Sequence, residues 1–447
     1  MVSRTSRPPD RARRLAFDAL RAVNAEGAYA NLILGQLLGE RRLDARDAAF
    51  ATELVAGTCR WQGSYDLIIA AAAGKPVTSW QPAVVDLLRL GTHQLMAMRM
   101  PAAAAVSATV ELAAATVGQR VTGLVNAVLR RVSARDLDGW LGQLSQGLDP
   151  FDELALRTAH PRWIVDAYAE LLPAEELRPA LEANNVGPPV TLAVRPGLAT
   201  VAELVATGAE TCEYSPFGAR LRGNPNELAA VREGRAGVQD EGSQLAAWAL
   251  TRTVAPAGWW LDLCAGPGGK AALLAGLAGA DDSRLLAVDV SLTRSALVSN
   301  AIRPFPEAWV VTADGTRPPW PSARFSRVLA DVPCTGLGAL RRRPEARWRR
   351  TPDDLGRLQP LQAGLFASAL NAVDIGGVVG YVTCSPHAHE TTAVVEQVLA
   401  GRPEFALVDA AELLPAVPGA SHGPYLQLWP HRQGTDAMFG AFVRRRH

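Results

Sequence analysis

Strand-like and helix-like segments alternate along the second half of the chain, and this alternation limits the folds that the region can adopt. Short apolar runs such as Trp259–Leu263, Leu285–Val288 and Val378–Val382 are separated by stretches whose apolar residues recur at helical spacing. Strands that alternate with helices in this way form a parallel sheet with helices on both faces. We therefore predict a doubly wound, Rossmann-like α/β domain over residues 237–447.

The first third of the chain has a different pattern. Apolar residues recur at helical spacing in Leu15–Val23 and Asn31–Leu38, and few β-branched clusters interrupt them. Further helical runs are predicted over Asp47–Cys59, Ser64–Ala73, Pro82–Met98, Ala103–Val117 and Thr122–Val132. We predict an all-α helical bundle over residues 1–135, a linker over 136–155 and a small α+β subdomain over 156–236.

Composition limits the class of protein. The 447 residues are too many for one ordinary core, and 48% apolar with 20% charged residues is typical of a soluble globular protein. Five scattered cysteines form neither a disulfide framework nor a zinc motif, so no metal is expected. No signal peptide and no membrane span are recognisable in the sequence. We expect a cytoplasmic protein that acts as a monomer.

Basic residues are concentrated near the N-terminus. Residues 1–135 contain 17 Lys and Arg against 10 Asp and Glu, which leaves 28 against 34 for the remainder of the chain. A basic first third joined to an acidic body suggests an electrostatic docking module for a polyanion. A solvated helical surface that happens to be basic is the alternative.

Two cysteine-bearing turns each follow an apolar strand of the predicted sheet. Asp331–Cys334 comes directly after Val328–Ala330, and Thr383–Pro386 comes directly after Val378–Val382. In open parallel sheets the carboxyl ends of the strands bind ligands, and a cysteine there can act as a soft nucleophile. A lone cysteine is more often a small core residue. Two of them at strand ends favour chemistry at Cys334 and Cys384.

A glycine-rich turn lies between a strand and a helix at Leu261–Lys270. Its glycines allow a ligand to approach the backbone amides at the helix start, and one of only two lysines in the chain, Lys270, lies within it. The spacing fits neither a P-loop nor the NAD fingerprint, so S-adenosylmethionine (SAM) is the ligand that fits best; a structural turn without a ligand is the alternative. The predicted cofactor-binding residues are Cys264, Ala265, Gly266, Pro267, Gly268, Gly269, Lys270, Asp289 for the ribose hydroxyls, Asp314 near the adenine, and Asp331.

An arginine run with one aromatic residue begins shortly after Cys334. Guanidinium groups can bind phosphates and an aromatic plane can stack on a base, so the run suits a splayed RNA strand. A solvated charged helix is the alternative. The predicted RNA-binding residues are Arg341, Arg342, Arg343, Arg347 and Trp348.

Together these segments resemble the RsmB/Sun family of RNA 5-methylcytosine methyltransferases. Cys264–Lys270 matches the family's SAM loop, Asp331–Cys334 its Asp-x-Pro-Cys turn and Thr383–Ser385 its Thr-Cys-Ser turn. The chain departs from the family at Gly266 and Ala271, and at Thr391, where asparagine is usual. Further matches lie at Gln239-Asp240, 341–345 with Trp348, and 434–436, and the N-terminal part resembles NusB-type RNA-binding domains through 57–60, 88–91 and 125–130.

The resemblance implies a 16S (small-subunit) rRNA cytosine-C5 methyltransferase of the subgroup that carries a NusB-like domain. It implies that Cys384 attacks C6 of the base, that Cys334 helps to release the product, and that Asp331 and Lys270 stabilise charge on the ring. DNA 5-methylcytosine enzymes instead attack with the Pro-Cys cysteine, so the residues alone leave the order of the thiols open. A non-catalytic RNA-binding factor related to NusB, with a degenerate methyltransferase fold, is the rival hypothesis.

Overall fold

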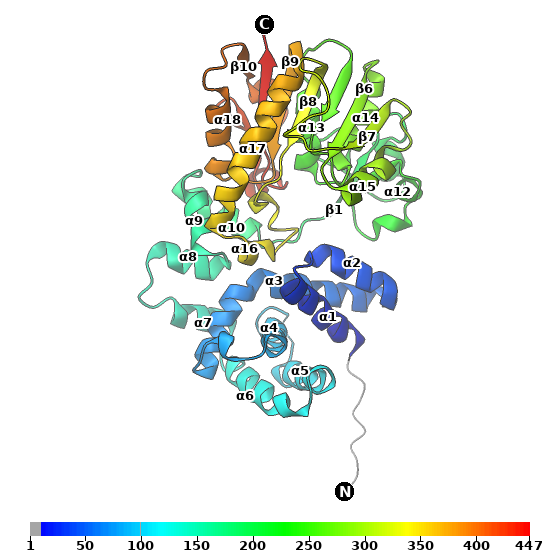
Figure 1. Ribbon diagram of the computed structural model, residues 1–447. Helices are drawn as coiled ribbons and strands as arrows, with labels where there is room; N and C mark the ends of the chain where they lie inside the picture. Colours follow the sequence, from blue (N-terminus) through cyan, green and yellow to red (C-terminus); the bar gives the residue numbers. More distant parts are fainter. Residues whose placement is uncertain (1–9, 99) are drawn as a thin grey trace. The chain divides into compact units, whose positions relative to one another are not determined.

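The computed structural model describes residues 10–98 and 100–447, which form two compact units (Figure 1). The first unit, called the helical unit, comprises the chain up to Asn185 together with Leu340–Arg350. The second, called the catalytic unit, comprises Val186–Ala339 and Thr351–His447. The chain therefore returns to the helical unit for one short segment within the second half of the sequence.

The helical unit contains only helices and turns among its described residues, as the apolar spacing predicts. Its core is formed by aliphatic side chains on one face of each of the first six α-helices, with Tyr65 and Trp140 packed among them. The α-helices are α1 (Arg11–Glu26), α2 (Ala30–Arg41), α3 (Ala45–Ala73), α4 (Pro82–Met96), α5 (Ala102–Thr116), α6 (Thr122–Val132), α7 (Leu137–Leu144), α8 (Pro150–Thr158), α9 (Arg162–Ala169), α10 (Ala174–Ala183) and α16 (Ala346–Arg349).

Two sequence expectations for this unit are wrong. The runs expected as two helices, 47–59 and 64–73, form the single helix α3. Gly57 and Gly63 lie inside this helix, where they allow other side chains to pack closely against it. A Cβ atom at Gly57 would collide with the ring of His93, and one at Gly63 with the ring of Trp348. The segment expected as a linker, 136–155, is largely helical: Asp136 and Asp149 cap α7 and α8 through their side chains.

The catalytic unit begins with a small antiparallel sheet. Its strand order is β2-β3-β1-β4, with the strands β1 (Val190–Val194), β2 (Glu210–Thr211), β3 (Gly218–Leu221) and β4 (Ala236–Val238). The short helices α11 (Val201–Val205) and α12 (Ala229–Arg232) accompany it. This is the predicted α+β subdomain, without the helices α8–α10, which belong to the helical unit.

A nine-stranded mixed sheet forms the centre of the catalytic unit, in the order β11-β12-β13-β9-β8-β5-β6-β7, with β10 paired to β13. The strands β5 to β9 are parallel, as predicted, whereas β13 joins β9 antiparallel. The strands are β5 (Trp259–Asp262), β6 (Arg284–Asp289), β7 (Ala308–Thr312), β8 (Phe325–Asp331), β9 (Val373–Thr383), β10 (Phe405–Val408), β11 (Ser421–His422), β12 (Tyr425–Gln427) and β13 (Phe439–Arg445).

Helices cover both faces of this sheet, which confirms the doubly wound architecture (Figure 1). The apolar side chains of α13 (Glu241–Thr251), α14 (Gly269–Ala280) and α15 (Leu292–Ile302) pack on one face. Those of α17 (Pro352–Ala372) and α18 (Thr392–Leu399) pack on the other. The short helices α19 (Ala410–Leu413) and α20 (Pro430–Gln433) lie among the C-terminal strands. No helix in the described part of the chain is long and apolar enough to cross a membrane.

Candidate active site

The carboxyl ends of three neighbouring parallel strands bring the predicted reactive residues together. Asp331 at the end of β8 is in register with Val382 of β9, and Asp262 at the end of β5 is in register with Leu329 of β8. The glycine-rich loop and both cysteine turns leave the sheet from these ends. The structure therefore places them at one edge of the sheet, where ligands bind in this class of fold.

The two predicted catalytic cysteines are in direct contact. The Sγ atoms of Cys334 and Cys384 are 3.1 Å apart, and both side chains are partly buried. The contact with Cys384, together with burial, raises the pKa of the Cys334 thiol well above its usual range. The backbone also joins the two turns, because Gly338 N donates to Cys384 O at 2.8 Å. The arrangement holds two sulfur atoms where a single ligand atom could reach both.

Lys270 and Asp331 form an ion pair beside the cysteines. Lys270 Nζ lies 2.9 Å from Asp331 Oδ2, and the Asp331 side chain retains 27% exposure. Burial acts to lower the pKa of Lys270, but the carboxylate of Asp331 and the nearby Cys384 outweigh it, and the net effect is a raised pKa. Lys270 is therefore a fixed positive charge near Cys384.

Asp262 is a site residue that the sequence analysis did not identify. Its side chain is fully buried, and neither carboxyl oxygen has a hydrogen-bond partner in the part of the chain that the structure describes. Burial, and then the charge of Asp331, raises the pKa of Asp262 to about 8. A charged residue that ends an apolar strand just before a glycine-rich turn is the sequence signal that could have revealed it.

The glycine-rich loop packs tightly against the end of β6. Gly266 N donates to Asp289 Oδ2 at 3.0 Å, and a Cβ atom at Gly266 would collide with that oxygen. Arg294 also binds Asp289, at 3.1 Å, and Ser291 N donates to its other oxygen. Gly268 has a φ of 112°, a conformation that favours glycine, and it precedes the first turn of α14.

These features fit S-adenosylmethionine. The loop offers backbone amides at the N-terminus of a helix, and the buried Asp262 carboxyl, which lacks a partner, suits a cationic ligand group. Among the residues predicted to bind the cofactor, Asp289 is already engaged by the loop. Asp314 lies on the surface beyond β7, where hydrogen bonds from Thr316 lower its pKa. Burial raises the pKa of the Cys264 thiol well above its usual value.

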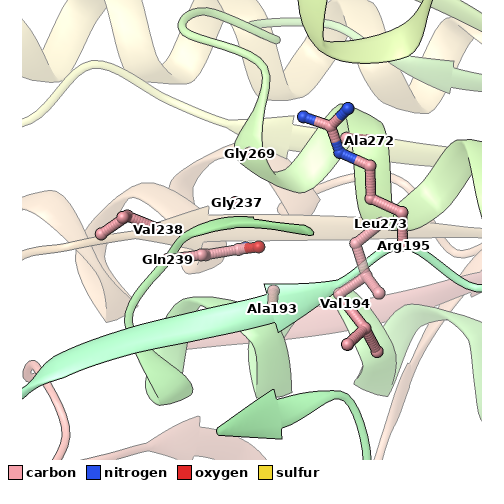
Figure 2. A pocket seen from close by; sticks show the side chains of 9 residues that line it. All are labelled: Ala193, Val194, Arg195, Gly237, Val238, Gln239, Gly269, Ala272 and Leu273. Atoms are coloured by element: carbon pink, nitrogen blue, oxygen red, sulfur yellow. The ribbon is translucent and has the colours of Figure 1, made fainter. Parts of the chain in front are cut away.

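A small cavity lies next to the start of α14, against the small antiparallel sheet (Figure 2). One charged side chain, that of Arg195, lines the cavity. It donates a hydrogen bond to Gly234 O, and burial lowers its pKa. The cavity is lined by Ala193, Val194, Arg195, Gly237, Val238, Gln239, Gly269, Ala272 and Leu273. It shares Gly269 with the predicted cofactor loop but contains neither cysteine, so it is separate from the reactive sulfur atoms.

The prediction that Arg347 binds RNA is wrong. Arg347 belongs to the helical unit, is fully buried, and donates to Ala159 O at 2.9 Å and Asn184 O at 3.2 Å. Ala159 and Asn184 are the C-cap residues of α8 and α10, where helices leave carbonyl groups unsatisfied. Arg347 also donates to Asn185 Oδ1 at 2.7 Å. Its charge stabilises helix ends inside the protein.

The next two residues, Trp348 and Arg349, also donate to backbone carbonyls of the helical unit. The indole nitrogen of Trp348 donates to Cys59 O at 2.8 Å, which occupies the polar edge of the ring predicted to stack on RNA. Arg349 donates to Val23 O at 2.6 Å and Gly27 O at 2.9 Å, at the C-terminal end of α1.

Arg341 is buried, and Arg342 is partly exposed. Arg343 is exposed, with its guanidinium 5.0 Å from the ring centre of Tyr29.

Comparisons with known proteins agree with this architecture. The family model described as "16S rRNA methyltransferase RsmB/F" matches residues 250–444, and the NusB family model matches residues 10–134. A protein of Mycobacterium tuberculosis ("Putative methyltransferase Rv1407") is 49% identical over 98% of this chain and 97% of its own length. A ribosomal RNA small subunit methyltransferase B of Pseudomonas putida is 35% identical over 89% of this chain and 90% of its own length.

Solved structures share the fold. The crystal structure of PH0851 has a TM-score of 0.81 at 21% identity and covers 97% of this chain and 98% of its own. NSun6 from Pyrococcus horikoshii, solved with SFG, has a TM-score of 0.57 at 17% identity and covers 65% of this chain and 99% of its own. The family-model match and the identities of the sequence relatives show that the chain belongs to the RsmB/F family of SAM-dependent rRNA methyltransferases.

Proposed function

We propose that this methyltransferase modifies C5 of a cytosine in 16S rRNA through a covalent adduct between Cys384 and C6. The observation that carries the proposal is the contact between two thiols, 3.1 Å apart, beside the Lys270–Asp331 ion pair. C5 of cytosine is a poor nucleophile until a thiolate adds to C6. A site that holds two sulfur atoms together is suited to both the addition and the later elimination.

The Cys384 thiolate forms a bond to C6, and the electron pair that it displaces makes C5 nucleophilic. S-adenosylmethionine would supply the methyl group: its bond from methyl to sulfur would break as the C5–methyl bond forms, and S-adenosylhomocysteine would leave. C5 then loses its proton to a base, and the bond between sulfur and C6 breaks, which restores the aromatic ring and the Cys384 thiolate. In this proposal Asp331 binds the edge of the base and Lys270 offsets the negative charge that develops nearby; their ion pair supports both roles.

The contact between the thiols supports Cys384 as the attacking group. The raised pKa of Cys334 keeps its proton in the resting site, and its largest cause is the contact with Cys384. Once Cys384 is bonded to carbon, its hydrogen bond with Cys334, which is this largest cause, is lost, and the pKa of Cys334 falls. Cys334 can then lose its proton and act as the base that removes hydrogen from C5.

The helical unit is proposed to bind the rRNA substrate. Support comes from its match to the NusB family and from the excess of basic residues within 1–135. Within this unit, the surface that contacts RNA does not include Arg347, since that side chain is buried.

Bisulfite sequencing of 16S rRNA tests the proposal. A strain that lacks the protein should lose methylation at one cytosine, and wild-type protein, but not the Cys384→Ser variant, should restore it. An unchanged methylation map in the deletion strain would contradict the proposal.

A further inference from the structure

The backbone on both sides of Cys334 is held by two buried side chains that the proposed chemistry does not use. Gln362 Nε2 donates to Pro333 O at 2.9 Å, on one side of the cysteine. Thr335 N donates to Glu390 Oε1 at 2.8 Å, on the other side. Gln362 Nε2 also donates to Glu390 Oε1 at 2.9 Å, so the two holding groups are themselves connected.

Glu390 ties this arrangement to the turn that carries Cys384. It ends the short 3-10 helix Ala388–Glu390 that follows the Thr-Cys-Ser turn, and its carbonyl oxygen accepts from Tyr381 Oη at 2.7 Å. The Thr335 hydroxyl donates to Glu390 Oε2 and lies 3.2 Å from Ser385 Oγ. The Thr335 hydroxyl thus connects the Glu390 carboxylate with Ser385, the residue after Cys384.

The buried position of Glu390 is unusual for a surface-type residue. Its side chain is 0% exposed, and three uncharged donors meet its two oxygens: a backbone amide, a hydroxyl and a side-chain amide. Charged side chains are rarely buried unless hydrogen bonds compensate for the loss of water. Two of these donors belong to Thr335, directly after Cys334, and Glu390 itself belongs to the segment that follows the Cys384 turn, so the carboxylate fixes the first turn relative to that segment.

We propose that Glu390 and Gln362 form a positioning pair that holds Cys334 against Cys384, and that product release depends on it. The inference rests on the proposed function, in which Cys334 removes the C5 proton. A proton transfer requires the base to lie within hydrogen-bond distance of the proton that it accepts. A shift of Cys334 therefore slows release, whereas attack by Cys384 and methyl transfer proceed.

The test variant is Glu390→Gln, which keeps the size of the side chain but replaces an acceptor by a donor that faces the donors of Thr335 and Gln362. Glu396→Gln on the exposed face of α18 is the matched control. Thr335→Val removes the hydroxyl that Glu390 binds, and Thr335→Ser retains it. The purified proteins react with an rRNA fragment and labelled SAM, and a denaturing gel detects RNA that remains bound to protein.

We expect Glu390→Gln and Thr335→Val to accumulate a methylated protein–RNA adduct, with multiple turnover reduced by roughly a hundredfold for Glu390→Gln. The single-turnover transfer of methyl and the affinity for SAM should stay near wild-type values in the folded proteins, whereas the melting temperature of Glu390→Gln should fall because buried donors lose their acceptor. Glu396→Gln and Thr335→Ser should turn over normally. Thr335→Val also answers the question if Glu390→Gln does not fold.

Other results overturn the inference. One such result is that Glu390→Gln and Thr335→Val lose single-turnover methyl transfer as much as multiple turnover and accumulate no adduct. Another is that both variants release the product at the wild-type rate. A Cys334→Ala sample in the same experiment separates the two proposals. If Cys334→Ala traps the adduct and the positioning variants do not, only the positioning role is wrong. If Cys334→Ala traps no adduct, the role of Cys334 in the proposed function is wrong, and the positioning role falls with it.

Discussion

The strand-end site and the arginine segment lie close together in sequence, but their polar groups are used in opposite ways. In the site, side chains of β5, β8 and the cysteine turns meet one another, and the Asp262 carboxyl is left without a partner. In Leu340–Arg350, the donors of Arg347, Trp348 and Arg349 are directed at backbone carbonyls of the helical unit. Polar groups without protein partners are those available to a ligand, and those already bonded stabilise the fold.

The largest expected effect comes from the attacking thiol. Cys384→Ser replaces a thiolate by a hydroxyl that remains protonated near neutral pH, so methyl transfer should fall by roughly 10⁴-fold or more. Incorporation of labelled methyl into rRNA measures it, with Cys212→Ser as a control outside the site. Retained activity in Cys384→Ser, with loss in Cys334→Ser, would mean that the two thiols have exchanged roles.

The next effect concerns the cation of the site. Lys270→Met should reduce kcat by about 10²- to 10³-fold, because a buried charge beside the reacting ring is lost. Lys270→Arg should not restore the rate, since a planar guanidinium cannot occupy the position of a compact ammonium next to Asp331. Steady-state kinetics compare the two variants, and full activity in Lys270→Arg would show that only net charge matters there.

Binding of RNA by Arg347 would contradict the structural role that the comparison gives to this side chain. Arg347→Met should lower the free energy of unfolding by about 3 kcal/mol or more, because carbonyls at two helix ends lose their donor. Chemical denaturation measures this loss. The salt dependence of RNA binding by the folded variant should equal that of the wild type. Unchanged stability with weaker, less salt-dependent RNA binding is the contrary result.

Asp262 gives a pH-dependent signal that the arginine segment lacks. Its pKa of about 8 in the folded protein exceeds that of an unfolded Asp, so the folded state binds the proton more tightly. Without cofactor, the free energy of unfolding contributed by this group should therefore fall as the pH rises from ~4 to ~8, by up to ~1.4 kcal/mol per pH unit. Asp262→Asn does not titrate, so its unfolding free energy should decline less across this window; equal slopes would contradict the assignment.

The smallest effect should come from Arg343, the exposed arginine of the predicted RNA-binding set. Arg343→Ala removes its contact with Tyr29, which is worth ~0.5–1 kcal/mol at an exposed site, and at most one phosphate contact. Filter binding at several salt concentrations should show the slope of log K against log salt decrease by about 0.7–0.9. An unchanged slope would leave the whole segment with a structural role.

The alternation of strands and helices after residue 259 was sufficient to predict the doubly wound sheet, and the two cysteine turns lie where strand ends predict them. The antiparallel C-terminal strands were missed because their pairing depends on distant partners: Phe442 of β13 pairs with Gly380 of β9. Glu390 carries no local signal of its role. Its bond to Thr335 joins residues 55 positions apart, which no local spacing reveals. The burial of Arg347 could not be predicted for the same reason, because the carbonyl groups that it binds lie far away in the sequence.

The return of Leu340–Arg350 to the helical unit has a consequence for how the protein can be divided. A cut after residue 135 removes Val23, Gly27 and Cys59, whose carbonyls bind Arg349 and Trp348. In the remaining fragment Trp348 and Arg349 would lose these partners, whereas Arg347 would keep Ala159 and Asn184. A truncation therefore does not simply subtract an RNA-binding module: it also frees the guanidinium of Arg349 and the indole of Trp348, and fragments made in this way can acquire RNA affinity that the whole enzyme does not have.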